Sequence, residues 1–158
     1  MNSHRPRRRF AQNFLVDRGV IRSIIGLVRP AEGEVVVEIG PGRGALTDGL
    51  VAGLKRLVAV EIDRDLAAML RERLAVEGLH LIEGDILDVD LGQILRDEGG
   101  HQLFIVGNLP YNITAPLIFN FLAQAEHIDR AVIMVQREVA QRLVAAPGSK
   151  DYSLLSVL

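Results

Sequence analysis

The chain has 158 residues, of which 49% are hydrophobic, a size and composition that fit one domain with a substantial core. Its net charge is −2, it has no cysteine, and its four histidines lack the spacing of metal ligands, so neither disulfides nor a metal site are expected. No apolar run approaches the roughly 20 residues that span a bilayer, and the basic N-terminus lacks the apolar stretch of a signal peptide, which predicts a cytoplasmic protein without a membrane segment.

Residues 1–16 are predicted to form a basic arm ahead of a domain at 17–158. The segment "RPRRRF" contains Arg7, Arg8 and Arg9, whereas the rest of the chain is net acidic. A localised arginine cluster on an acidic body suggests contact with the phosphates of a nucleic acid. A solvated tail without a partner is the alternative that charge alone leaves open.

Five short segments rich in β-branched residues are predicted to be strands. Most of them are apolar on both faces, which is typical of a parallel sheet covered by helices on each side. The segments are "EVVVEIG" (34–40), "LVAVEI" (57–62), "LHLIEG" (79–84), "LFIVGN" (103–108) and "AVIMVQ" (131–136).

Segments of helical periodicity lie before, between and after these strands. The predicted helices are one capped by Asp17 and ended by Pro30, one at about 44–54, one capped by Asp63 and ended near Gly78, one capped by Thr114, and one at 137–146. The alternation of strands and helices predicts a doubly wound α/β sheet.

The loop after the first predicted strand is rich in glycine. In "EIGPGRG" and the residue that follows it, Gly40, Gly42 and Ala45 have the G-x-G-x-x-G/A spacing, and the segment adds Gly44 and the acidic Glu38. Glycines at such positions allow a tight turn and let a ligand approach the backbone. The loop therefore predicts a nucleotide-like cofactor, with a plain connector as the alternative.

Acidic residues end the next two predicted strands. Glu61 lies about 20 residues beyond the glycine loop, where a carboxylate can accept hydrogen bonds from ribose hydroxyls. Asp85, in "EGDI", ends the third strand, where a carboxylate can accept from an adenine amine. Because the carboxyl ends of parallel strands meet at one edge of a sheet, both are predicted to line the same crevice. For either acid alone, a helix cap or a solvated turn is the alternative.

The fourth predicted strand delivers Asn108, Leu109, Pro110 and Tyr111 to the same edge of the sheet. A planar exocyclic amine is a poor nucleophile, because its lone pair is delocalised into the ring. Acceptors aimed at the amine hydrogens, such as the Asn108 side-chain carbonyl and the Leu109 main-chain carbonyl, favour a pyramidal nitrogen that can attack a methyl group. Pro110 fixes the turn and Tyr111 can stack on a base. A strand-to-helix turn with the tyrosine as a lid on the core is the alternative.

Together these motifs resemble the S-adenosylmethionine-dependent rRNA adenine N6-dimethyltransferases of the KsgA type. The matching segments are "RFAQNFLVD" (9–17), "VEIGPGRGALT" (37–47), "EIDRDL" (61–66), "GDIL" (84–87), "NLPYNITAPLIF" (108–119) and "QREVAQRLVAAPGSKDYSLLSV" (136–157). The resemblance covers almost the whole chain and implies a Rossmann-like, class I methyltransferase fold with a doubly wound, mostly parallel sheet.

The resemblance also implies a reaction and its partners. S-Adenosylmethionine would methylate N6 of two adjacent adenines in a hairpin near the 3′ end of small-subunit rRNA, on free rRNA or the immature 30S subunit, during ribosome biogenesis and without a metal. The implied cofactor contacts are Asn13, Leu15, Gly40, Glu61, Asp85 and Asn108. The target amine would be held by Asn108, Leu109, Pro110 and Tyr111. The implied RNA-facing cations are Arg7, Arg8, Arg9, Arg137, Arg142 and Lys150.

The chain departs from the family pattern after the fifth predicted strand. Members normally continue with further strands, a second aromatic side chain for the target base and a helical domain that grips RNA. We therefore expect a truncated chain that keeps most of the cofactor pocket but loses much or all of its methyl transfer. Ser153 also stands where the family often has glycine. A monomer is expected at full length, with association through the exposed sheet edge in this shorter chain.

Five other functions stay open on the sequence. The nearest is a large-subunit rRNA adenine methyltransferase of the macrolide-resistance type. DNA adenine and protein glutamine methyltransferases use a similar turn, although usually with proline in place of Leu109. A non-catalytic module for small-subunit assembly would bind through the arginine arm, and a nicotinamide dehydrogenase would use the glycine loop for a pyrophosphate.

Overall fold

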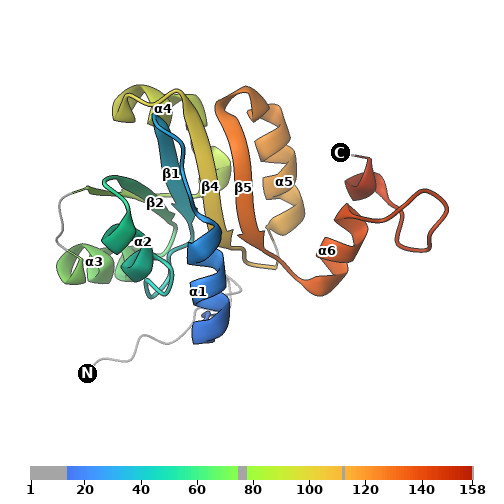
Figure 1. Cartoon of the computed structure of the whole chain (residues 1–158), viewed down its shortest axis with the longest axis horizontal. Helices are drawn as coiled ribbons and strands as arrows, with labels where there is room; N and C mark the ends of the chain where they lie inside the picture. The colour runs from blue at the N-terminus through green and yellow to red at the C-terminus, as the bar shows by residue number, and fades with distance from the viewer. Residues whose placement is uncertain (1–13, 75–77, 112, 158) are drawn as a thin grey trace.

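The computed structural model describes residues 14–74, 78–111 and 113–157, and its centre is a sheet of five parallel strands (Figure 1). The strands are β1 (Glu34–Ile39), β2 (Leu57–Glu61), β3 (Leu79–Glu83), β4 (Gln102–Asn108) and β5 (Ile128–Met134). Their order is β3-β2-β1-β4-β5, so the direction of winding reverses between β1 and β4. Open α/β sheets bind ligands at such a switch point, outside the carboxyl ends of the strands.

Helices cover both faces of this sheet, which confirms the predicted doubly wound architecture (Figure 1). The helices are α1 (Arg18–Leu27), α2 (Thr47–Gly53), α3 (Arg64–Arg73), α4 (Leu91–Glu98), α5 (Thr114–Ala123) and α6 (Arg137–Leu143), with short 3₁₀ turns η2 (Ile86–Asp88), η3 (Ala125–His127) and η4 (Leu154–Ser156). Within the described ranges, no helix is long and apolar enough to cross a membrane.

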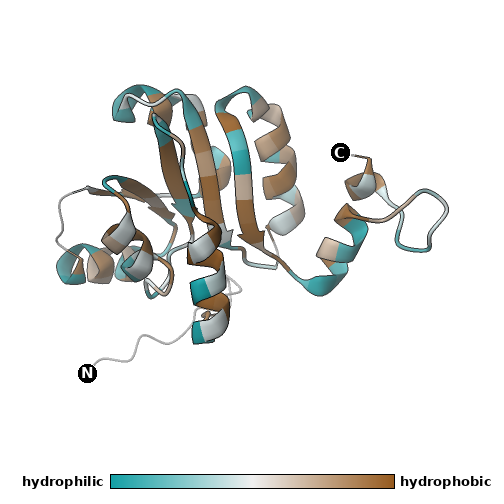
Figure 2. Cartoon of the chain, in the orientation of Figure 1, coloured by the Kyte–Doolittle hydropathy of each residue, from teal (hydrophilic) through white to brown (hydrophobic). Residues whose placement is uncertain are grey.

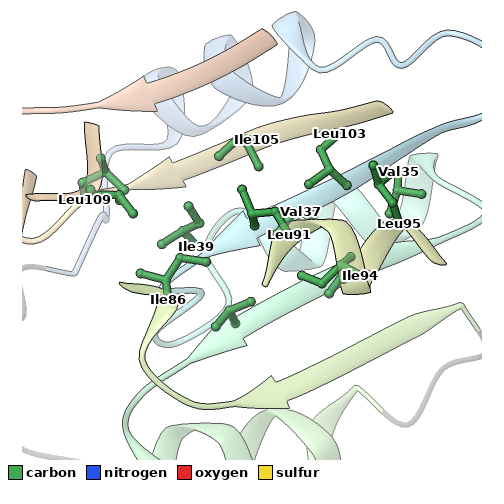
Figure 3. Close-up of a cluster of buried hydrophobic side chains, with 13 residues drawn as sticks. Val35, Val37, Ile39, Ile86, Leu91, Ile94, Leu95, Leu103, Ile105 and Leu109 are labelled. Atoms are coloured by element: carbon green, nitrogen blue, oxygen red, sulfur yellow. The ribbon is translucent and has the colours of Figure 1, made fainter. Parts of the chain in front are cut away.

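The core is divided between the two faces because successive side chains of a strand point to opposite sides. Val36 and Phe104 pack with residues of α1 and α2, whereas Val37 and Ile105 pack with α4 and α5. Figure 3 shows the second cluster, in which side chains of β1 and β4 meet Leu91 of α4. The brown strands of Figure 2 show the same distribution, since β1 and β4 are hydrophobic along most of their length. Two buried faces hold these central strands rigidly, and their carboxyl ends with them.

Helix α4 was missed by the sequence-based prediction. The Asp90 side chain caps it by accepting a backbone N–H at 3.0 Å, and Gly99 ends it with a φ of 65°. Leu91, Ile94 and Leu95 form its buried face. These signals are visible in the sequence, but the helix that they bound has only 8 residues. The predicted N-caps of α1 and α3 are confirmed by side-chain hydrogen bonds to the first turn of each helix.

Two predicted helix ends were wrong. Gly78 does not end α3, which stops at Arg73. It precedes β3 with a φ of 93°, and a Cβ there would lie 2.4 Å from the Lys55 carbonyl oxygen, so it permits a close approach of two backbones. Thr114 is the first residue of α5 rather than its N-cap, and its hydroxyl donates to the Pro110 carbonyl at 3.0 Å.

Strand β5 lies at the edge of the sheet and begins at Ile128, earlier than the predicted start at 131. The sequence-based prediction missed this start because the strand includes the charged residue Arg130. Its guanidinium pairs with Glu34 at 2.8 Å and lies 4.9 Å from the centroid of the Phe104 ring. Beyond β5, helix α6 and turn η4 extend away from the sheet (Figure 1). Association through this edge stays a prediction.

Candidate active site

A cavity of about 490 Å³ opens where the strands reach their carboxyl ends. Its volume falls in the range of small-molecule sites. The predicted cofactor residues that line it are Leu15, Gly40, Glu61, Asp85 and Asn108. Leu109 and Pro110 line it as well, so the structure brings the predicted cofactor and acceptor residues into one site. Asn13 lies outside the described residues.

The glycine loop forms one wall of this cavity. Gly40, Gly42 and Gly44 have φ values of 61°, 59° and 83°, a region in which other residues are strained. The Gly40 N–H donates to the Val60 carbonyl and the Gly42 N–H to the Glu61 carboxylate, both at 2.9 Å. These bonds fix the loop against β2. Helix α2 begins only after this loop, which is later than predicted.

Glu61 supports the loop and also faces the cavity. Its side chain is almost fully buried, with one carboxylate oxygen accepting from the Gly42 N–H and the other from the Asp63 N–H, each at 2.9 Å. Burial raises the pKa of Glu61, and these backbone hydrogen bonds oppose the rise. Each carboxylate oxygen has a second lone pair, so loop support and ligand binding are compatible.

Asp85 follows β3 and serves as a cap while it lines the cavity. Its Oδ1 atom accepts from the Leu87 N–H at 3.0 Å and begins turn η2. The alternative of a cap is therefore confirmed and is compatible with a place in the cavity wall, while contact with a cofactor stays a prediction. The second oxygen of a carboxylate can accept from an amine of a ligand.

Phe14 and Arg43 line the cavity, although the sequence analysis did not single them out. The Arg43 guanidinium lies 4.4 Å from the centroid of the Phe14 ring, within the range of a cation–π contact. The ring also lies close to the glycine loop, because a Cβ on Gly42 would be 3.4 Å from it. This contact holds the segment before α1 against the loop. An aromatic side chain and an arginine are visible in the sequence, but their pairing is not.

The acceptor side follows β4. Leu109 is buried, and its N–H donates to the Met134 carbonyl at 3.0 Å, which fixes the main chain at the end of the sheet. The Pro110 carbonyl accepts from the Thr114 hydroxyl at 3.0 Å. Tyr111 is 51% exposed and is not among the described residues that line the cavity. The exposed ring excludes the alternative in which the tyrosine is a lid on the core.

Glu38 is a buried carboxyl in the cavity wall, next to the end of β1. It is only 1% exposed, and among the described residues its Oε2 atom has no hydrogen-bond partner. Burial raises the pKa of Glu38 to about 8, with the Thr47 hydroxyl opposing the rise and the negative charges of Asp48 and Glu61 adding to it. The sequence shows an acid at this position but not that it is buried.

The predicted RNA-facing cations that the structure describes lie on one protruding segment. Arg137 and Arg142 are exposed on α6, and Lys150 is exposed in the turn after it. No residue of α6 is buried, and the helix leads away from the sheet (Figure 1). Arg7, Arg8 and Arg9 lie outside the described residues. The described ranges contain no group of side chains that could hold a metal ion.

Comparison with known proteins decides the family. The family model described as "Ribosomal RNA adenine dimethylase" matches residues 3–158. The chain belongs to this family. Among the curated relatives of this chain, the proteins named "Ribosomal RNA small subunit methyltransferase A" from Bordetella petrii and Aromatoleum aromaticum are each 50% identical over 158 residues. The chain spans 58% of the length of each of these relatives.

Solved structures confirm the methyltransferase fold of this chain. A dimethyladenosine transferase from Plasmodium falciparum matches with a TM-score of 0.77 and 28% identity, over 92% of this chain and 51% of that one. The 23S rRNA methyltransferase ErmE matches with a TM-score of 0.70 and 30% identity, over 82% of this chain and 50% of that one. The predicted class I methyltransferase fold and the resemblance to the rRNA adenine dimethyltransferases are thus both confirmed.

Proposed function

We propose that this dimethylase-family chain binds S-adenosylmethionine in the cavity and methylates N6 of two adjacent adenines in a hairpin near the 3′ end of small-subunit rRNA. One observation carries the proposal: the glycine loop and strand-end acids line the same cavity as Asn108, Leu109 and Pro110. A methyl donor and an amine acceptor can therefore meet at one place. The cytoplasmic location and the small-subunit partner belong to the same proposal.

The hydrogen-bond acceptors that line the cavity fit S-adenosylmethionine. Glu61 suits the two ribose hydroxyls, Asp85 suits the adenine amine, and the positive-φ turn at Gly40 admits a ligand close to the backbone. Leu15, together with Asn13, would complete the contacts. When bound, the cofactor supplies an electrophilic methyl group.

The acceptor residues would prepare the adenine amine for attack. The Asn108 side-chain carbonyl and the Leu109 main-chain carbonyl would accept the two amine hydrogens and leave the nitrogen lone pair directed at the methyl group. The Pro110 carbonyl already accepts from the Thr114 hydroxyl, which leaves the Leu109 carbonyl as the better main-chain acceptor. Because transfer depends on positioning, it needs no histidine base, and no described residue that lines the cavity is a histidine.

The RNA would meet the protein beside the cavity. The exposed Tyr111 ring offers a stacking surface for a base taken out of its stack. The cations Arg137, Arg142 and Lys150 supply charge for phosphates, and the arginine arm adds to them. Aromatic stacking and phosphate contacts are the usual elements of single-strand RNA recognition.

A single-turnover assay tests the proposal. Small subunits that lack these methyl groups are incubated with labelled S-adenosylmethionine and an excess of protein, because we expect slow transfer. Mass spectrometry of the digested rRNA should find labelled N6,N6-dimethyladenosine, and Asn108→Ala should remove it while RNA binding persists. No label under conditions in which the cofactor is bound would overturn the catalytic proposal. Subunit binding that is independent of the cofactor and of Asn108 would then favour the non-catalytic assembly role.

Large-subunit rRNA is the second candidate substrate, because the fold also matches the 23S rRNA methyltransferase ErmE. The names of the curated relatives favour the small subunit. Mapping the labelled nucleotide in a mixture of both subunits distinguishes the two substrates.

A further inference from the structure

Glu38 has no step in the proposed mechanism, yet its position is unusual for a carboxyl group. It is 1% exposed, and its neighbours in register on β2 and β4 are Ala59 and Val106, which cannot ionise. It lines the cavity, and its Oε2 atom has no hydrogen-bond partner among the described residues. Thr47 supplies the hydrogen bonds that Glu38 receives from the described residues, and none of them reaches Oε2. Since buried polar atoms in native proteins are normally paired, this oxygen points to a partner that is not among the described residues, and its place in the cavity wall is open to a ligand.

The charges around Glu38 indicate the chemistry of that partner. Asp48 on α2 and Glu61 on β2 add negative charge, and Asp85 lines the same cavity. Of the described residues that line the cavity, Arg43 is the one cation, and its guanidinium stacks on an aromatic ring of the cavity wall. An excess of acids in a buried site disfavours an ionised Glu38 until a positive ligand arrives.

We propose that Glu38 is a proton-linked receptor for an organic cation bound in this cavity. In the ligand-free protein the carboxyl is neutral. When the cation binds, the O–H bond of the carboxyl breaks and the proton leaves to solvent. The carboxylate then pairs with the cation, which replaces the proton as the positive charge at this site. The inference rests on the proposed function, in which the ligand is S-adenosylmethionine, a molecule with an ammonium and a sulfonium group. The pKa of Glu38, which burial raises to about 8, agrees with a neutral carboxyl at neutral pH.

Calorimetric titration with S-adenosylmethionine tests this proton linkage. At about pH 7, titrations in two buffers of different ionisation enthalpy count the protons released. The wild-type chain should release close to one proton per ligand. At pH values below the pKa of Glu38, its Kd should fall by up to about tenfold for each unit by which the pH is raised. Glu38→Gln should release almost none and lose this pH dependence. Asp97→Asn removes an exposed carboxyl of α4 that does not line the cavity, and should match the wild type.

The outcomes separate this inference from the proposed function. Binding without proton release overturns the inference and leaves the cofactor assignment standing, whereas no binding by a folded chain overturns both. S-Adenosylhomocysteine lacks the sulfonium charge, so an equal proton release with this ligand identifies the ammonium group as the partner. Proton release only with S-adenosylmethionine identifies the sulfonium group. Where Glu38→Gln does not fold, binding by the wild type without proton release still overturns the inference.

Urea unfolding tests the same carboxyl without any ligand. Between the ordinary glutamate pKa of 4.5 and a folded-state value of about 8, the folded protein holds a proton that the unfolded chain has lost. The free energy of unfolding should therefore fall as pH rises through this window, and the fall should be smaller in Glu38→Gln. Equal slopes for the two proteins would overturn the inference.

Discussion

On the β1–β2 side of the cavity, a hydrogen bond of 2.9 Å joins Gly42 to Glu61, and the carboxyl groups of Glu38 and Glu61 are buried. On the β4–β5 side, Tyr111 is exposed and α6 has no buried residue. A cofactor is small and constant, so a rigid pocket can be built around it. An RNA is large and must enter from solvent, so its side of the site is open. From this difference we expect the β1–β2 side to determine cofactor affinity and the β4–β5 side to determine methyl transfer and RNA binding.

Asn108 lies where the two sides meet, so its loss gives the largest expected effect. Asn108→Ala removes an acceptor that acts on the amine in the transition state, and single-turnover transfer should fall by at least about 100-fold. The Kd of S-adenosylmethionine, measured by calorimetry, should rise by about tenfold or less. Transfer within a factor of a few of the wild type, by a variant with an unchanged melting temperature, would place amine activation elsewhere.

Glu61 tests the cofactor side alone. Glu61→Gln removes a charge and leaves one of two backbone N–H groups without its acceptor, so the Kd of S-adenosylmethionine should rise by roughly 10-fold to 100-fold. Transfer at saturating cofactor should change much less. Glu83→Gln is the matched control, because this exposed residue at the end of β3 pairs with arginines outside the cavity and should leave the Kd unchanged. An unaltered Kd in both variants would remove Glu61 from the cofactor site.

Gly78 tests whether the rigidity of the cofactor side rests on close backbone packing. Gly78→Ala would place a Cβ 2.4 Å from the Lys55 carbonyl oxygen at a φ of 93°, and should lower the free energy of unfolding by about 2 kcal/mol. Gly26→Ala is the control in the last turn of α1, where a Cβ would have no neighbour within 4 Å. It should raise the free energy of unfolding by about 0.5–1 kcal/mol. Urea denaturation measures both, and equal effects would argue against the close approach at Gly78.

Arg142 should give the smallest effect, because the RNA-facing side offers many weak phosphate contacts. Arg142→Ala should weaken binding of small-subunit RNA by a few-fold at low salt and lower the slope of log affinity against log salt by about one. Arg96→Ala is the control, since this exposed arginine lies on α4, outside the α6 segment, and pairs with the helix cap Asp90. Filter binding across a salt series measures both variants. The same salt slope in all three proteins would exclude α6 from the RNA interface.

The sequence predicted the central strands well but missed weaker elements. The β1 and β4 segments contain the apolar runs Val35–Val37 and Leu103–Val106, which are typical of strands buried on both faces. Helix α4 was missed because it is short, and the start of β5 was missed because Arg130 carries a charge. That charge is accommodated by Glu34 and the Phe104 ring, partners that come from other strands.

The sequence by itself determined the α/β class, the glycine loop and the presence of Glu61, Asp85 and Asn108 at strand ends, because periodicity, turn glycines and strand termini are local properties of the chain. Only the tertiary structure decided that Glu38 is buried beside the cavity and that Phe14 meets Arg43. These facts depend on which faces of distant segments meet. Burial and pairing are set by packing between such segments, and packing is what raises the pKa of the Glu38 carboxyl and leaves its Oε2 atom without a hydrogen-bond partner among the described residues.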